Sequence, residues 1–384
     1  MAAPPPAGHR EQAQELVDSL AKPPKSLGEL EHWAIALCTA QCTLKPSVSP
    51  ATVLVFVADH GVKKEDTTLS PYPPQVTQAV FRALAAGVSA TAVLARTNGA
   101  HLVVVDVGID GSVYGVEGAS SSISVIHAKI SRGTADCRNG LPAIADAATL
   151  DKAIEVGRGR VAYEIAERGT KVVAIGEVGI GNTTVAAALL AALVDGADPA
   201  DCCGRGTGLD DLGLAHKVEV VRQMISAHSY WLKACSGDAE KAKVALERLG
   251  GLEIAAMVGA YLEASERRLV ALVDGFISGV AALIATRIEP GVRSCLLFAT
   301  ALEEEPGAAK GGAILSKALN ASPALCMGLR LGEASGATLA LPLLKAAAAI
   351  VSEMATLNEA IALGATERMD HLEEEQRRAG APAD

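Results

Sequence analysis

A glycine-rich turn is the segment of this sequence best suited to hold a ligand. It covers residues 176–184 and reads Gly-Glu-Val-Gly-Ile-Gly-Asn-Thr-Thr. Gly179 and Gly181 carry no Cβ, so backbone N–H groups can approach a bound group closely. Asn182 and Thr183 can cap a following helix, whose N-terminus attracts anions. The turn is therefore predicted to hold the phosphate of a nucleotide.

The carboxylate of Glu177 needs a different partner, because it would repel a phosphate at which it pointed. A sugar hydroxyl or a developing positive charge suits it better. The turn lacks the lysine of G-x-x-x-x-G-K-[ST] and the third glycine of G-x-G-x-x-G. These absences disfavour a nucleoside triphosphatase and a dinucleotide-binding dehydrogenase. The plain alternative is a helix cap that holds no ligand.

A second glycine-rich segment could enclose the same group from another side. It reads Gly204-Arg205-Gly206-Thr207-Gly208. Its N–H groups and the Thr207 hydroxyl suit a phosphate, and Arg205 or Lys217 could supply positive charge. Because a simple turn has the same composition, this segment supports a phosphate site only together with the first one.

Isolated polar residues could take part in proton transfer. Glu333 lies between small residues in segment 328–337, and an apolar surround would raise its pKa towards that of a useful general base. Asp59, His60 and Asp274 each follow an apolar run. A strand-end aspartate often forms a turn, and structural histidines are common, so each of these three has a non-catalytic alternative.

The elements that must position these residues alternate between short apolar strands and Ala-rich helices. The expected strands are 52–57, 102–107, 172–175, 269–273 and 294–298. This alternation is typical of a mostly parallel sheet with helices on both faces, and ligands bind beyond the carboxyl ends of such strands. We therefore predict an α/β, Rossmann-like fold.

The two ends of the chain follow a different pattern. Residues 11–45 are expected to be helical with a break at Pro23-Pro24, and residues 352–378 are also expected to be helical. We predict a small helical domain formed by residues 1–45 and 352–384, with residues 46–351 as the large catalytic domain.

Composition excludes some classes of protein. The chain has 384 residues, half of them apolar, and a formal net charge of −10, which disfavours general nucleic-acid binding. The eight cysteines form no C-x-x-C pair, so reduced thiols, a cytoplasmic location and no metal site are expected. The N-terminus lacks a secretory apolar region, and the apolar run 185–194 is too short to span a membrane.

Together these segments resemble the nicotinate-nucleotide:dimethylbenzimidazole phosphoribosyltransferase family, which makes the lower-ligand nucleotide of cobalamin. The matching segments, in chain order, are 23–31, 58–62, 72–77, 106–108, 176–184, 204–210, 250–254, 274–276 and 330–337. The resemblance implies a Rossmann-like sheet, a small helical domain from both termini, a homodimer, and no cofactor or metal. It also implies transfer from nicotinate mononucleotide to dimethylbenzimidazole, giving α-ribazole phosphate and nicotinate.

The resemblance also implies roles for individual residues. Glu333 matches the family's general base, and Glu177 matches the residue near the ribose. The implied phosphate and ribose set is Gly179, Gly181, Asn182, Thr183, Gly204, Gly206, Thr207, Gly208 and Lys217. The implied base-binding set is Tyr72, Gln75, Phe81 and Leu331. The loop around Tyr72, with its prolines, could flank a planar ring or simply cover the sheet.

The sequence departs from the family at three places, one of which is Leu69-Ser70-Pro71, where the family has Gly-Val-Ser-Ala. The family's Ser-His-x-Ser-Ala-Glu-x-Gly segment is replaced in residues 300–307, where Ala301 and Glu303 stand for its histidine and second serine. Pro74 also comes before Gln75 in the ring-binding loop. The acceptor could therefore be adenine, another benzimidazole or a phenolic base. Two other readings stay open: a weakened homologue that binds a base or nucleotide as a sensor or carrier, and a different Rossmann-like enzyme such as a dehydrogenase.

Overall fold

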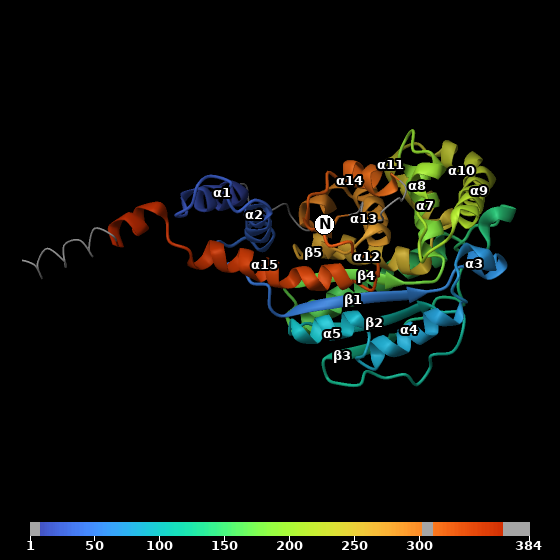
Figure 1. Cartoon of the computed structure of the whole chain (residues 1–384), viewed down its shortest axis with the longest axis horizontal. Helices are drawn as coiled ribbons and strands as arrows, with labels where there is room; N and C mark the ends of the chain where they lie inside the picture. The colour runs from blue at the N-terminus through green and yellow to red at the C-terminus, as the bar shows by residue number, and fades with distance from the viewer. Residues whose placement is uncertain (1–7, 302–309, 364–384) are drawn as a thin grey trace, which may run out of the picture. The chain divides into compact units, whose positions relative to one another are not determined.

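A parallel β-sheet forms the centre of the computed structural model, which describes residues 8–301 and 310–363 (Figure 1). In this described part, the seven strands are β1 (Ala51–Ala58), β2 (His101–Gly108), β3 (Ile123–His127), β4 (Val172–Val178), β5 (Val270–Val273), β6 (Leu296–Thr300) and β7 (Pro323–Leu325). Their order is β3-β2-β1-β4-β5-β6-β7, and every neighbouring pair is parallel. This order extends the Rossmann arrangement, so the predicted fold is confirmed.

The helices that accompany the strands follow in chain order. They are α1 (His9–Ser19), α2 (Glu29–Gln41), α3 (Gly61–Glu65), α4 (Gln75–Ala85), α5 (Ala90–Thr97), α6 (Ala147–Arg168), α7 (Asn182–Leu193), α8 (Pro199–Cys202), α9 (Asp211–Ala227), α10 (Ser229–Ala234), α11 (Asp238–Leu249), α12 (Leu252–Glu266), α13 (Phe276–Ile288), α14 (Gly311–Leu319) and α15 (Ser335–Glu353). Short 3-10 turns occur at Thr67–Leu69, Cys137–Asn139 and Pro290–Cys295.

Both faces of the sheet are covered, because every residue of β1 is buried. Alternate β1 residues, Leu54 and Phe56 among them, belong to a large buried cluster with α6, α7, α12 and α13. No described residue of α4 or α5 belongs to that cluster, although both helices contact the sheet. They cover the opposite face and lie against β2 in Figure 1. Helices on both faces explain why both faces of the inner strands carry mostly apolar residues.

Helix α6 and helix α12 pack so closely that their backbones nearly touch. A Cβ added to Gly157 would lie 1.8 Å from the Ala256 carbonyl oxygen, and one added to Gly259 would lie 1.9 Å from the Ile154 carbonyl oxygen. Larger residues would push the helices apart. These glycines therefore fix the distance between α6 and the helix that covers the centre of the sheet.

The contacts divide the chain into two compact units. One contains residues 48–342 and the whole sheet. The other contains α1, α2 and the described residues from Leu343 onward. Within this second unit, Leu20 and Thr356 form an antiparallel bridge, and Lys22 Nζ lies 3.0 Å from Glu31 Oε1. The domain boundaries inferred from the sequence stay predictions.

Within the described residues, two helical stretches are long and apolar enough to cross a membrane by length and composition alone. They are Gln75–Thr97 and Ser335–Glu353, with 39% and 56% of their apolar windows buried. The first is interrupted between α4 and α5, which contact the sheet. Because core helices of many proteins pass the same test, the two stretches are weak evidence for a membrane span.

Candidate active site

A cavity of about 480 Å³ opens at the carboxyl ends of three adjacent strands. Glu177 from β4, Asp274 after β5 and Thr300 from β6 all line it. In open parallel sheets this edge is where ligands bind. The two glycine-rich segments and the Glu333 segment also line the cavity, so the structure brings the three predicted segments together.

The turn between β4 and α7 forms one wall. A Cβ added to Gly179 would lie 2.5 Å from the Ala58 carbonyl oxygen, so the turn can pass this point only with glycine. Gly181 has a φ of +99°, which also favours glycine. Asn182 begins α7 and donates a hydrogen bond from Nδ2 to Glu177 Oε2. This contact orients the Glu177 carboxyl group beside the N-terminus of the helix.

A fully buried lysine joins the two glycine segments. Lys217 Nζ lies 2.9 Å from Thr183 Oγ1 and 2.9 Å from the Gly204 carbonyl oxygen, to which it donates. Arg205, the other predicted cation, instead pairs with Asp211 at 2.5 Å. Of the two predicted cations, Lys217 is therefore the one that contacts both glycine segments, which together we call the cradle, and Arg330 also lines the cavity.

Glu333 sits in a backbone conformation that side chains rarely adopt. Gly332, Glu333 and Ala334 have φ values of +81°, +60° and +62°. Two consecutive non-glycine residues in the left-handed region cost free energy, and such strain often accompanies functional sites. The Glu333 N–H donates to the Glu177 carbonyl oxygen at 3.0 Å, and a Cβ added to Gly176 would lie 2.1 Å from Ala334 N. Strand β4 thus holds the Glu333 loop directly.

Burial raises the pKa of three carboxyl groups in the cavity. For Glu333, groups of Thr91 and Ser89 oppose the rise. For Glu177, burial and the nearby Glu253 and Asp274 carboxyls raise the pKa well above its ordinary value. For Asp274, burial raises the pKa to about 7, although backbone N–H groups such as that of Ala337 oppose it. A carboxyl group with a raised pKa is a better proton acceptor than one in water.

Known proteins match almost the whole chain. A family model described as phosphoribosyltransferase matches residues 2–361. A nicotinate-nucleotide–dimethylbenzimidazole phosphoribosyltransferase from Xanthomonas axonopodis pv. citri is 42% identical over 357 residues, which are 93% of this chain and 95% of that protein. The one from Pseudomonas aeruginosa is 43% identical over 351 residues, which are 91% and 93%. The chain belongs to the nicotinate-nucleotide–dimethylbenzimidazole phosphoribosyltransferase family.

A solved structure supports the same assignment. The crystal structure of CobT from Thermus thermophilus superposes with a TM-score of 0.80 at 35% identity, covering 91% of this chain and 98% of that one. The resemblance inferred from the sequence motifs is therefore confirmed, as are the phosphoribosyltransferase class and the α/β fold.

Most residues that the family resemblance implied line the cavity. They are Tyr72, Glu177, Gly179, Asn182, Thr183, Gly204, Gly206, Thr207, Lys217, Leu331 and Glu333. Gly181, Gly208, Gln75 and Phe81 are not among the lining residues. Gly181 packs against Lys63, and Gln75 is exposed at the start of α4. Phe81 is fully buried in α4, because its side chain faces the core rather than the cavity.

The sequence analysis does not identify several apolar residues that line the cavity. Val76 and Val80 of α4 line the cavity, as do Leu329 and Phe276. The spacing of four residues between the two valines places them on one helix face, which was the available signal. Apolar residues at this spacing usually indicate core, so the signal alone does not identify a ligand site.

His60 has a structural place rather than a place in the cavity. Its Nε2 lies 2.9 Å from Glu253 Oε1, and both side chains are fully buried. A Cβ added to Gly179 would lie 3.0 Å from the same ring nitrogen. The His60–Glu253 pair therefore packs against the turn that contains Gly179. Of the segment that departs from the family, Thr300 and Ala301 line the cavity, and residues 302–309 lie outside the described part.

Proposed function

We propose that this chain transfers the phosphoribosyl group of nicotinate mononucleotide to dimethylbenzimidazole, for the nucleotide loop of cobalamin. One observation carries the proposal: a single cavity contains a lysine-braced glycine cradle, an apolar wall and the buried carboxyl groups of Glu177 and Glu333. These are the parts that a phosphate, a ribose and an aromatic base would each require.

The cradle would hold the donor. The 5′-phosphate fits the glycine segments, where the Lys217 ammonium group and the N-terminus of α7 both favour an anion. The Glu177 carboxyl group then faces the ribose, where it steadies positive charge as the bond from C1′ to nicotinate breaks. Nicotinate leaves as a neutral pyridine ring that carries the bonding electrons away, so its departure needs no acid.

The opposite wall would hold the acceptor. Tyr72, Val76, Val80 and Leu331 offer an apolar surface to a planar base. One benzimidazole nitrogen attacks C1′ with its lone pair, and the proton on the other nitrogen passes to the Glu333 carboxylate. Attack on the face opposite nicotinate inverts C1′ and gives the α-linkage. Holding both substrates in one cavity supplies much of the remaining rate.

We also propose that the enzyme is a cytoplasmic homodimer with no cofactor, metal, nucleic-acid or membrane partner. The family resemblance supports the dimer, and the net charge of −10 disfavours a polyanionic partner. The second candidate function is a weakened homologue that binds a base or nucleotide as a sensor or carrier. The changed residues Ala301 and Glu303 motivate it.

A panel of acceptor bases distinguishes these functions. The protein is incubated with nicotinate mononucleotide and, in turn, dimethylbenzimidazole, benzimidazole, adenine or a phenol, and each nucleotide product is identified by its mass. We expect a product of the mass of α-ribazole phosphate with dimethylbenzimidazole. Tight binding of nicotinate mononucleotide by folded protein with no product from any base would favour the sensor or carrier.

A further inference from the structure

A buried lysine outside the catalytic cavity holds one of the loops that line it. Lys63 of α3 is only 2% exposed. Its ammonium group donates to the Thr67 carbonyl oxygen and, at 3.0 Å, to the Ser70 carbonyl oxygen. Burial lowers the pKa of this lysine. A buried ammonium group is costly unless it is hydrogen-bonded, so the two carbonyl contacts tie the loop to Lys63.

The loop held by Lys63 reaches both subsites of the cavity. The Ser70 hydroxyl lies 2.9 Å from the Thr207 hydroxyl and accepts a hydrogen bond from the Tyr72 N–H at 3.2 Å. Thr207 belongs to the phosphate cradle, and Tyr72 lines the wall assigned to the acceptor base. A displacement of Ser70 would therefore move residues that line the proposed binding sites of both substrates.

The aliphatic part of Lys63 also contacts the first glycine turn. A Cβ added to Gly181 would lie 2.6 Å from Lys63 Cβ. The same side chain thus packs under the turn at the start of α7 while its ammonium group binds the loop before α4. Lys63 therefore contacts both the turn before α7 and the loop before α4, and each of these segments lines the cavity.

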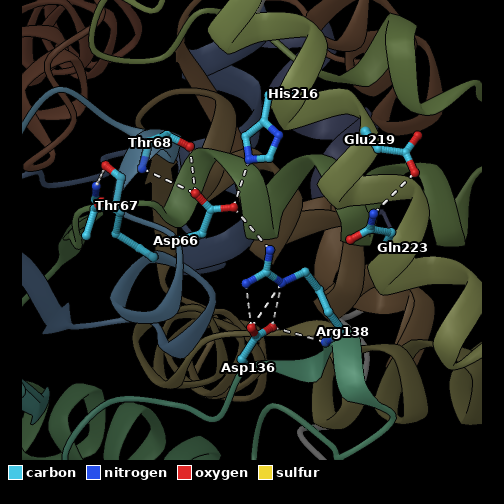
Figure 2. Close-up of polar contacts among 9 residues, drawn as sticks. Asp66, Thr67, Thr68, Asp136, Arg138, His216, Glu219 and Gln223 are labelled. Carbon is cyan, nitrogen blue, oxygen red and sulfur yellow. Dashed lines mark hydrogen bonds and ion pairs between the residues drawn. The ribbon is translucent and has the colours of Figure 1, made fainter.

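A second contact fixes the middle of the Lys63 segment, by which we mean residues 63–70. Figure 2 shows Asp66 between His216 and Arg138, with Oδ2 2.8 Å from His216 Nε2 and 3.1 Å from Arg138 Nη1. Arg138 in turn pairs with Asp136 at 2.6 Å. His216 precedes the cradle residue Lys217 on α9, so the segment is anchored to the helix that carries the buried ammonium group.

We propose that Lys63 is a positioning residue that couples the acceptor-base wall to the phosphate cradle through the Lys63 segment. The inference rests on the proposed function and adds a residue that touches neither substrate. Without the ammonium group, the segment loses its two carbonyl contacts, the Ser70–Thr207 bridge loosens and the Tyr72 wall moves. The acceptor base then meets a displaced surface.

The test compares Lys63→Met with Lys64→Met. Lys64 is the adjacent residue, but its side chain is 60% exposed and pairs with Asp110 at the surface at 3.0 Å. Steady-state kinetics are measured for nicotinate mononucleotide and dimethylbenzimidazole. In Lys63→Met we expect the KM for dimethylbenzimidazole to rise about tenfold and kcat to fall about tenfold, because misplacement by about 1 Å can cost that much or more. Lys64→Met should stay within about twofold of the wild type, as surface changes usually do.

A double variant tests the coupling itself. If Lys63 acts through the Ser70–Thr207 bridge, then Ser70→Ala should cost little more in the Lys63→Met background than in the wild type, because the bridge is already lost. Effects that multiply would overturn the proposal, as would wild-type kinetics in Lys63→Met. A merely structural lysine would lower the amount of folded enzyme and hence the apparent kcat, with both KM values unchanged, and that result would also overturn it.

Two further measurements cover the cases in which Lys63→Met does not fold or the wild type shows no turnover. If Lys63→Met does not fold, Ser70→Ala removes the bridge without exposing a buried charge, and a KM for dimethylbenzimidazole equal to that of the wild type would reject the coupling. If the wild type itself shows no turnover, the proposed function fails separately. The inference is then judged on the Kd for nicotinate mononucleotide, which should rise in Lys63→Met and stay constant in Lys64→Met.

Discussion

Glu333 and Glu177 are joined by a backbone hydrogen bond of 3.0 Å, yet their surroundings suit them to different work. Glu177 is oriented by Asn182 at a helix N-terminus and lies among other buried carboxyls. Glu333 lies at the N-terminus of α15, where Thr91 and Ser89 approach its carboxyl group. Because burial raises the pKa of both groups, the proposed division of work rests on position: Glu177 lies beside the helix N-terminus that would hold the phosphate, and Glu333 lies in the loop that carries Leu331 of the apolar wall.

Replacing the proposed base tests the role of Glu333. Glu333→Gln keeps the shape of the side chain but removes the basic oxygen, so kcat should fall by about 10²–10⁴-fold, the usual contribution of a general base. Binding of nicotinate mononucleotide, measured by calorimetry, should change little. Glu155→Gln on the exposed side of α6 is the matched control and should leave kcat unchanged. Unchanged turnover in Glu333→Gln would remove Glu333 from the base role.

The pH dependence of kcat should report the same carboxyl group. Glu333 must be ionised to accept a proton, and burial raises its pKa above 4.5. The rate should therefore fall as the pH drops through a midpoint above 4.5, which is higher than for an exposed glutamate. A pH–rate profile of the wild type measures that midpoint. In Glu333→Gln the part of the acidic limb that belongs to Glu333 should be lost, and a limb unchanged from the wild type would assign it to another buried carboxyl group such as Glu177.

At the scale of elements, strand β4 positions both carboxyl groups of the proposed site, Glu177 and Glu333. Its end supplies Glu177, and the absence of a side chain at Gly176 leaves room for the strained loop of Glu333 and Ala334. The strain is held by the hydrogen bond from the Glu333 N–H to the Glu177 carbonyl oxygen. The positions of the two carboxyls therefore depend on the strand as much as on their own side chains.

Adding one methyl group to β4 should disable the enzyme. In Gly176→Ala, the new Cβ would lie 2.1 Å from Ala334 N, so the Glu333 loop must move. We expect kcat to fall by about 10²-fold or more, as for other misplaced catalytic groups. Gly159→Ala is the control, because nothing lies within 4 Å of its new Cβ in α6, and it should raise the free energy of unfolding by about 0.5–1 kcal/mol. Full activity in Gly176→Ala would show that the loop does not depend on the strand.

The strands can be predicted from the sequence where they form continuous apolar runs between polar or glycine-rich turns. The five inner strands are runs of buried, mostly apolar residues, and the sequence predicts all five. Strands β3 and β7 were missed, because β3 is only partly buried and contains Ser124 and His127, and β7 has three residues starting with Pro323. Edge strands of this kind lack the continuous apolar run that marks a central parallel strand.

The same limit applies to the site. Glycine-rich turns, Glu333 and Lys217 have unusual residue types for their positions, so the sequence alone pointed to them. Val76 and Val80 look like core residues, and Phe81, which is fully buried, looks equally suited to a base. Only the orientation of α4 against the sheet decides which of its apolar residues face the cavity, and sequence spacing does not fix that orientation.

At the scale of the whole molecule, buried carboxyls make folding stability depend on pH. The pKa of Asp274 is about 7 in the folded protein against an ordinary 3.8, so the folded state binds the extra proton between these values. Its contribution to stability is complete below about pH 4 and is lost as the pH rises through about 7. The buried Asp274 carboxyl group thus weakens the fold above about pH 7.

Replacing Asp274 should reverse part of that cost. Asp274→Asn keeps an oxygen that can accept the Ala337 N–H, now 2.9 Å from Oδ1, but it removes the buried charge. The free energy of unfolding at pH 8 should rise, by up to about 4 kcal/mol if the full shift is recovered. Its decrease between pH 4 and pH 7, measured by urea titration, should become smaller than in the wild type. An unaltered slope would mean that Asp274 does not carry the extra proton.

The configuration of the product tests the central claim most directly, namely that one cavity holds both substrates for in-line transfer with inversion. The purified enzyme is incubated with nicotinate mononucleotide and dimethylbenzimidazole, and the anomeric configuration of the nucleotide is determined by NMR. We predict α-ribazole 5′-phosphate as the sole nucleotide product, formed in equal amount with nicotinate. A β-linked product, or no product from folded enzyme that binds both substrates, would contradict the account.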